Sequence, residues 1–176
     1  AKEIRYTKKE LNNTLLFGAY PEVHMSPVVM KPGVLNEIVS MYIYRNLYKN
    51  ERIQKDGVLE KLMVAIAHEL GSPVSLSKIG RLVGIDSKTV LRYIRLLEKH
   101  FVVFRHFDYL GHQKSICRKV CFCKIYFYDL GVRNYILDAL ENSFGQGDLP
   151  ALWENYQMLE KKKLVINMEV IGRYSV

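Results

Sequence analysis

The fold is decided by residues 74–107, which read VSLSKIGRLVGIDSKTVLRYIRLLEKHFVVFRHF. A first helix with one apolar face is predicted by residues spaced three and four apart: Leu76, Ile79, Leu82 and Val83. Gly84 ends this helix, because glycine readily adopts the left-handed conformation that closes helices. The pattern therefore predicts a helix that stops at a tight turn.

The residues after this turn predict a second helix and a strand. Asp86 and Ser87 offer side-chain oxygens that can cap the helix. Its apolar stripe has the same spacing as the first: Val90, Tyr93, Ile94 and Leu97. Residues 101–104, FVVF, follow as a β-branched and aromatic strand, and Gly80 lets the two helices cross closely. Helix, turn, helix and strand in this order predict a winged helix-turn-helix.

The composition is that of a globular chain with one ordinary domain or two small ones. Of its 176 residues, 49% are hydrophobic and 25% are charged, which is enough to bury a core. The apolar runs are too short to cross a bilayer, and no signal peptide is visible. Three cysteines, an odd number without an export signal, favour a reducing compartment. We therefore expect a cytoplasmic protein that does not associate with membranes.

The net charge of +8 is concentrated in one third of the chain. Residues 78–129 carry four acids against eleven basic residues, a local charge of +7: Lys78, Arg81, Lys88, Arg92, Arg95, Lys99, Arg105, Lys114, Arg118, Lys119 and Lys124. A basic patch confined to a helix-turn-helix and its wing is typical of nucleic-acid binding. The alternative is a solvated face of a basic protein.

Outside this region the sequence predicts mostly helices. Thr7 and Glu10 form a capping box that begins a short helix, which ends at Gly18. A loop is expected at residues 26–33, and further helices at about 34–50, 57–70, 132–141 and 150–160. Residues 120–128 predict the second wing strand, and residues 164–166, LVI, a last strand. The expected fold class is mainly α with a small β-wing: a winged helix-turn-helix plus an N-terminal helical segment and a C-terminal helical tail.

Neither a metal site nor a catalytic constellation is predicted. Cys117, Cys121 and Cys123, with His112 nearby, have the spacing C-x₃-C-x-C, which lacks the paired C-x₂-C knuckles of structural zinc. Cys121 and Cys123 fall on one face of a strand, where small apolar side chains pack well. The Asp that ends YFYD at residues 126–129 mimics a Walker B strand, but the chain contains no phosphate-binding G-x-x-x-x-G-K-[ST] loop.

Four segments together resemble a known family. They are LLFGAYPEV (15–23), residues 70–105 around the helix-turn-helix, KIYFYDLGVRNYIL (124–137) and ALWENYQMLE (151–160). The chain resembles the C-terminal part of a large prokaryotic family of predicted AAA+ ATPases, in which the ATPase domain is followed by a domain labelled only as of unknown function. The resemblance extends over nearly the whole chain.

The resemblance implies a division into three parts. Residues 1–32 would be the tail of an ATPase lid and a linker, residues 33–130 the helical winged-helix domain, and residues 131–176 a helical tail that begins a truncated PD-(D/E)XK nuclease-like region. Glu154 would then lie at the edge of a nuclease site. Its metal-binding partners are not identifiable before Val176, which favours a structural or capping role for Glu154.

The resemblance also bears on catalysis. The Walker motifs of the family lie N-terminal to the matching region, so the chain is expected to be a fragment of a longer ATPase-family protein. ATP and Mg²⁺ are expected only for the missing ATPase core. This chain by itself is expected to have no enzymatic activity and to bind no cofactor.

Two functions remain open from the sequence. In the first, the second helix lies in the major groove of DNA and presents Ser87, Lys88, Arg92, Arg95 and Lys99. Arg92 could read a guanine, Lys88, Arg95 and Lys99 suit phosphates, and the wing loop adds Lys114, Arg118 and Lys119. In the second, the same helices dock the ATPase core or a partner protein without DNA. Leu91 on the outward face and several tyrosines favour that alternative.

Overall fold

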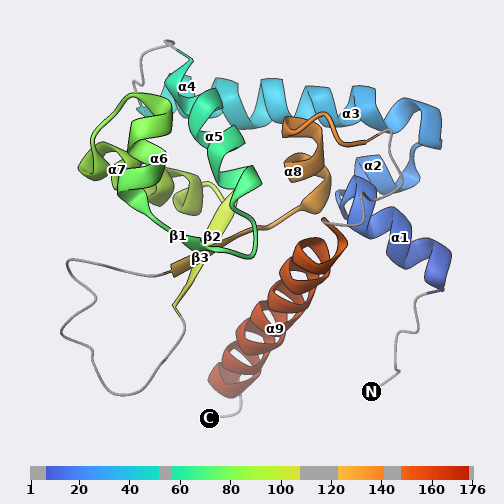
Figure 1. The fold of residues 1–176 in the computed structure, drawn as a ribbon. Helices are drawn as coiled ribbons and strands as arrows, with labels where there is room; N and C mark the ends of the chain where they lie inside the picture. The colour runs from blue at the N-terminus through green and yellow to red at the C-terminus, as the bar shows by residue number, and fades with distance from the viewer. Residues whose placement is uncertain (1–6, 52–56, 108–122, 141–147, 175–176) are drawn as a thin grey trace.

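The computed structural model of the protein describes residues 7–51, 57–107, 123–140 and 148–174. These residues are mainly helical with a small β-element, as the sequence predicted. The β-element is a three-stranded antiparallel sheet, of which the sequence predicted two strands. Figure 1 shows α1 and α2 at one end of the molecule and α6 and α7 at the other, with α8 between them. One hydrophobic core runs through these elements. Among the described helices, none has the length and apolar character needed to cross a bilayer.

The N-terminal segment contains more helix than predicted. Helix α1 (Lys8–Phe17) begins at the predicted capping box, in which the Thr7 amide donates to Glu10 Oε2 at 2.7 Å. Helix α2 (Pro21–Met25) follows. The expected loop at residues 26–33 is wrong, because the 3₁₀-helix η1 (Val28–Met30) and the start of α3 occupy most of it. Pro21 and Pro32 lie in first helical turns, where no N–H is required, so these prolines mark helix starts.

A long helical rod follows, made of α3 (Lys31–Glu37), the π-helical segment η2 (Ile38–Tyr44) and α4 (Arg45–Glu51). It spans the molecule from the N-terminal helices to the neighbourhood of α5 (Figure 1). Buried apolar residues hold it on the core: Leu35, Ile38, Val39, Ile43 and Leu47. The predicted helix at about 34–50 is confirmed, with an earlier start and a π-helical middle.

Helices α5 (Val58–His68), α6 (Leu76–Val83) and α7 (Ser87–Lys99) pack around the predicted turn. Gly80 is required there, because a Cβ at this position would lie 2.5 Å from the carbonyl oxygen of Ile85 and 3.5 Å from Val90. The prediction that Leu82 belongs to the buried face is wrong, since its side chain is 65% exposed. The buried face of α6 consists of Ile79, Gly80 and Val83, and Leu82 points away from it.

The sheet joins residues that are distant in the sequence. Strands β1 (Pro73–Val74), β2 (Val103–Phe107) and β3 (Cys123–Phe127) lie in the order β1-β3-β2, and both pairings are antiparallel. Val103 is opposite Phe127, and Phe107 is opposite Cys123. The Cys123 side chain is buried in β3, while Cys117, Cys121 and His112 lie outside the described residues. In the described part of the chain no group of three His, Cys, Asp or Glu side chains could hold a metal ion.

After β3 the chain forms a tight joint with the N-terminal segment. Asp129 caps α8 (Leu130–Ile136), where its Oδ1 accepts the Val132 N–H at 3.1 Å and its Oδ2 accepts the Ala19 N–H at 2.7 Å. A Cβ on Gly131 would lie 2.1 Å from the Phe17 carbonyl oxygen, so α8 and α1 meet backbone to backbone. Burial raises the pKa of the Asp129 carboxyl, and these backbone donors partly offset that effect.

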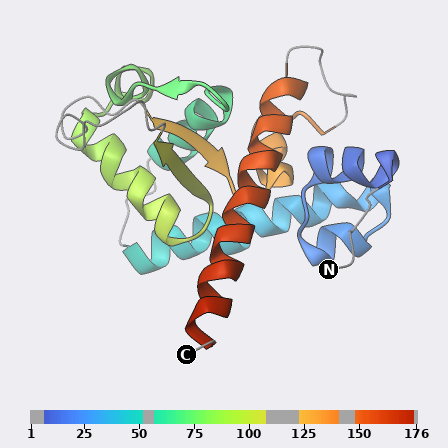
Figure 2. The same ribbon diagram turned by 90° about the horizontal axis from the view of Figure 1, so that it is seen from below.

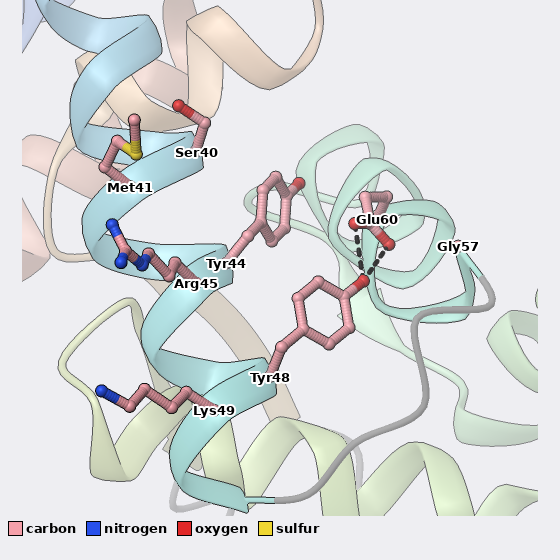
Figure 3. Close-up of a pocket in the computed structure, with 8 residues that line it drawn as sticks. All are labelled: Ser40, Met41, Tyr44, Arg45, Tyr48, Lys49, Gly57 and Glu60. Carbon is pink, nitrogen blue, oxygen red and sulfur yellow. Dashed lines mark hydrogen bonds between the residues drawn. The ribbon is translucent and has the colours of Figure 1, made fainter.

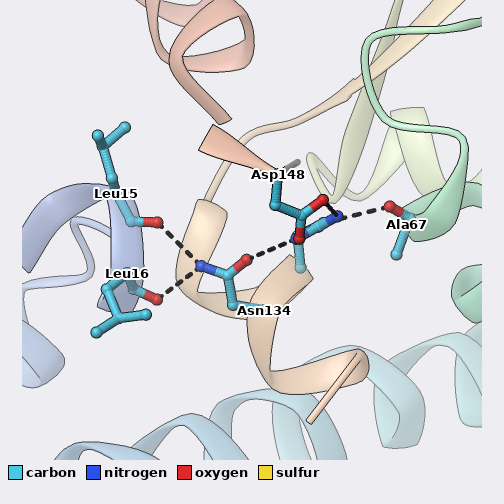
Figure 4. Close-up of polar contacts among 6 residues, drawn as sticks. Leu15, Leu16, Ala67, Asn134 and Asp148 are labelled. Carbon is cyan, nitrogen blue, oxygen red and sulfur yellow. Dashed lines mark hydrogen bonds and ion pairs between the residues drawn. The ribbon is translucent and has the colours of Figure 1, made fainter. Parts of the chain in front are cut away.

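Buried polar side chains of α8 complete this joint (Figure 4). Asn134 Nδ2 donates to the carbonyl oxygens of Leu15 and Leu16, at 2.9 and 2.8 Å, and so satisfies the C-terminal end of α1. Arg133 donates to the Ala67 carbonyl oxygen at 3.2 Å and forms a two-pronged ion pair with Asp148. These two residues of α8 therefore connect α1, α5 and the start of α9.

Helix α9 (Leu149–Tyr174) crosses the sheet and extends past it (Figures 1 and 2). The buried Asn155 side chain accepts the Phe127 N–H at 2.8 Å and donates to the Phe127 carbonyl oxygen at 2.9 Å, so it pairs with β3 as a neighbouring strand would. The predicted strand at residues 164–166 is wrong, because α9 continues through it. Extending an existing helix gains one hydrogen bond per residue, whereas a strand needs a partner.

Candidate nucleic-acid interface

The outward face of α7 carries five of the residues that the sequence proposed for DNA contact. Ser87, Lys88, Arg92, Arg95 and Lys99 all have exposed side chains. The four cations follow one another at spacings of four, three and four residues, so they lie along one face of the helix over about 16 Å. The structure therefore brings these five residues together on a single surface, which we call the α7 face.

The inward face of the same helix fixes this orientation. Val90, Tyr93, Ile94 and Leu97 are buried in the core. Because they occupy the opposite side of the helix, rotating α7 to hide the cations would expose these four side chains to water. Leu91, which the sequence placed outward, is half-buried.

Hydrogen bonds hold the start of α7. Asp86 Oδ1 accepts the N–H groups of Lys88 and Thr89, at 2.8 and 3.1 Å, and Oδ2 accepts the Thr89 hydroxyl at 2.6 Å. The hydroxyl and amide of Thr89 keep the pKa of the Asp86 carboxyl below its usual value. The cap therefore stays ionised at neutral pH and fixes the residue at which α7 begins.

The end of α7 is held by a charged contact with β2. The Glu98 carboxylate accepts the Arg105 backbone N–H at 3.0 Å and two guanidinium N–H groups, at 3.1 and 2.7 Å. Both side chains are largely buried, with 25% and 18% of their surface exposed. Arg105 therefore positions α7 against the sheet, although the sequence counted it within the basic patch.

Other cations of the basic patch are also paired. Lys78 forms an ion pair with Glu69, and Lys124 forms one with Glu154 at 2.8 Å. None of the ion pairs between described residues involves Lys88, Arg92 or Arg95. At Lys88, Arg92 and Arg95 the positive charge therefore has no acidic partner among the described residues, unlike the charge of Lys78, Arg105 and Lys124.

Lys114, Arg118 and Lys119, which the sequence predicted to lie in a wing loop, are outside the described residues. The two predicted strands on either side of them correspond to β2 and β3, which pair from Val103 with Phe127 to Phe107 with Cys123. The part that these three cations play in binding therefore stays a prediction.

Glu154 lies in a structural contact. Its Oε1 accepts the Lys124 ammonium at 2.8 Å and the Tyr126 hydroxyl at 2.7 Å. Burial raises the pKa of this carboxyl, but the Lys124 and Tyr126 hydrogen bonds outweigh burial, and the net pKa lies below the usual value. These contacts fit the structural role that the sequence favoured for Glu154.

A surface hollow of about 700 Å³ lies over η2 (Figure 3). Tyr44 and Tyr48 point toward Glu60, and the Tyr48 hydroxyl lies 2.6 Å from both carboxylate oxygens. Arg45 and Lys49 point to the other side of the helix. Burial, followed by the charge of Glu60, raises the pKa of the Tyr44 hydroxyl, so this tyrosine stays protonated and cannot serve as a base at neutral pH. Glu60, the one carboxylate among the eight residues that line the hollow, is already bound by Tyr48.

The sequence reading missed one residue beside the α7 face. Phe101 was assigned to the strand, but it precedes β2, has a φ of 54° and is 69% exposed. Left-handed residues after a helix are usually glycine, and no glycine stands here to signal the conformation.

Comparison with known proteins gives one match. Neither the curated proteins nor the solved structures contain a match to this chain. A family model matches residues 8–143, from the first residue of α1 to beyond α8, which is more than half of the chain. The chain therefore belongs to the family described as Domain of unknown function (DUF8612).

Proposed function

We propose that the chain is a winged helix-turn-helix module that binds double-stranded DNA through the α7 face. The element order α5, β1, α6, α7, β2, β3 with sheet order β1-β3-β2 supports this fold. In this proposal α7 lies in the major groove, Arg92 faces a base edge, and Lys88, Arg95 and Lys99 contact phosphates. Lys114, Arg118 and Lys119 of the wing would contact the flanking backbone.

The observation that carries the proposal is the stripe of cations on α7. Three of them, Lys88, Arg92 and Arg95, have no acidic partner among the described residues, although nearby cations do. Exposed like charges repel one another, so a row of them on one rigid helix favours a polyanionic ligand. The spacing suits a helix that follows the phosphates at the edges of a groove.

The experiment is fluorescence anisotropy with a labelled duplex of about 25 base pairs at several salt concentrations. The variant Lys88→Ala/Arg92→Ala/Arg95→Ala is compared with the control Lys8→Ala/Lys9→Ala/Lys61→Ala, which removes the same charge from exposed sites on α1 and α5. We expect the slope of log K against log salt to fall by about 1.8 in the α7 variant, since each lost phosphate contact reduces it by about 0.9 and Lys88 and Arg95 are the two phosphate contacts removed. Equal slopes in the two variants would contradict the proposal.

The alternative proposal is a coupling module that docks a partner protein. Exposed apolar side chains favour it: Met25, Val28, Val29 and Met30 follow one another in a short segment, and Leu82 lies on α6. The proposed kinship with AAA+ ATPases would make the missing ATPase core a natural partner. Absence of duplex binding at low salt, together with capture of a separately expressed ATPase core, would favour this alternative.

We further propose that the chain has no enzymatic activity of its own and uses no cofactor. This rests on the missing Walker motifs and on the contacts that occupy Glu154. An ATPase assay of the purified chain tests it, and turnover above the buffer rate would contradict it.

A further inference from the structure

Phe101 has a backbone conformation that a phenylalanine rarely adopts. Its φ is 54°, in the left-handed region. It closes α7 in a Schellman arrangement, in which the Val102 N–H donates to the Leu97 carbonyl oxygen at 2.9 Å and the Phe101 N–H to Glu98 at 3.1 Å. Glycine fits this position without steric cost, so phenylalanine here is unfavourable for the backbone.

Packing in the core does not explain this side chain. Phe101 is 69% exposed, and its ring and that of the half-buried Tyr128 meet in a T-shaped arrangement, with the ring centres 5.6 Å apart and an interplanar angle of 72°. An exposed aromatic ring on a strained residue is a common feature of binding surfaces, where the strain is tolerated for the contact that the ring makes.

A cation lies over the Tyr128 ring. The Lys162 ammonium of α9 lies over the rings of Phe104 and Tyr128, 5.0 and 5.8 Å from their centres. Lys99, the last cation of the α7 face, precedes Phe101 by two residues and is exposed. Figure 2 shows α9 passing the end of α7 and the sheet, in agreement with these contacts. Phe101, Tyr128 and Lys162 thus form one surface, the aromatic corner, which begins two residues after Lys99, the end of the α7 face.

We propose that the aromatic corner binds an unpaired nucleotide where one strand leaves the duplex. This inference rests on the proposed DNA binding by α7. Within a duplex both faces of each base are covered by its neighbours, so an exposed phenyl ring finds a free base face only in a single strand. Lys99 and Lys162 would neutralise the adjoining phosphates. The preferred DNA is therefore a duplex with a single-stranded extension.

The test compares three labelled DNAs: a blunt duplex of about 25 base pairs, and the same duplex with a 5′ or a 3′ extension of about six nucleotides. Stacking of one base is expected to tighten binding to one of the extended duplexes by about tenfold. In Phe101→Gly this preference should disappear while binding to the blunt duplex stays the same. Phe101→Trp should retain the preference, because it keeps an aromatic face.

Phe101→Gly also separates binding from folding. Glycine adopts the observed φ readily, so we expect the melting temperature of this variant to stay within about 3 °C of the wild-type value. A larger fall would assign Phe101 a structural role and overturn the proposal, as would a loss of blunt-duplex binding in this variant.

The failure of this inference differs from the failure of the proposed function. If all three DNAs bind equally and blunt-duplex binding still depends on Lys88, Arg92 and Arg95, only the proposal for the aromatic corner is overturned. A preference for an extension that survives in Phe101→Gly would do the same. Binding to none of the three DNAs would overturn both proposals.

Discussion

The joint around α8 and the α7 face both carry charged side chains. They differ in burial and pairing, since the charges of the joint are buried and paired and those of the α7 face are exposed. At the joint, Arg133 and Asp129 are buried and fully engaged by backbone groups or by Asp148. On the α7 face, Lys88, Arg92 and Arg95 are exposed and have no acidic partner among the described residues. The joint therefore uses charge to hold the fold together, whereas α7 leaves its charge exposed to solvent, as the proposed DNA binding would require.

The largest effect on stability is expected for Gly131→Ala. The new Cβ would lie 2.1 Å from the Phe17 carbonyl oxygen, and two backbones would have to separate, which should cost about 3 kcal/mol. Gly33→Ala is the control: it lies in α3 with no atom within 4 Å of its Cβ, and should gain up to about 1 kcal/mol. Urea unfolding measures both. Similar stabilities would show that α1 and α8 do not meet as closely as described.

A smaller loss is expected for Asn155→Asp. The new carboxylate cannot donate to the Phe127 carbonyl oxygen and would be a buried charge, which should cost about 2 kcal/mol. Trp153, the single tryptophan of the chain, lies on α9 and reports on its docking by fluorescence. Asn46→Asp makes the same chemical change at an exposed position of α4 and should leave stability unaltered. If Asn155→Asp has the same fluorescence and stability as the wild type, the pairing of α9 with β3 is contradicted.

Asp148→Asn tests the ion pair of the joint through its pH dependence. Hydrogen bonds from Arg133 lower the pKa of the Asp148 carboxyl. A carboxyl with a lowered folded-state pKa stabilises the fold above its unfolded pKa, and this contribution is lost as the pH falls through the folded value. The wild type should therefore be more stable than Asp148→Asn at pH 7, and the difference should shrink below about pH 4. A difference that does not change with pH would contradict the pairing.

The smallest effect on stability is expected for the variant Lys88→Ala/Arg92→Ala/Arg95→Ala. These side chains are exposed and alanine favours helices, so the free energy of unfolding should change by less than about 0.5 kcal/mol. Thermal unfolding in the buffer used for DNA binding checks this. A clear loss of stability would show that the cations hold the fold, and the contrast between the α7 face and the joint would disappear.

Local features of the fold were readable from the sequence. The capping box of α1, the turn at Gly84 and the buried stripes of α6 and α7 depend on neighbours within about four residues, apart from the misassigned Leu82. Pro32 was assigned to a loop because the same residue that breaks a helix interior also suits its first turn. The segment LVI at 164–166 was misread because its β propensity is outweighed by continuation of α9.

For the candidate site, the sequence alone determined which polar residues of α7 face outward, since helical spacing with one buried stripe fixes the opposite face; Leu91, also placed outward, is half-buried. Only the tertiary structure decided which cations form ion pairs, because a pair such as Arg105 of β2 with Glu98 of α7 joins two different elements. It also decided the joint: Asp129 bonds Ala19, and Asn134 bonds Leu15, each across more than 100 residues. Spacing along the chain carries information about neighbours on one helix, whereas contacts between distant segments follow from how the elements pack.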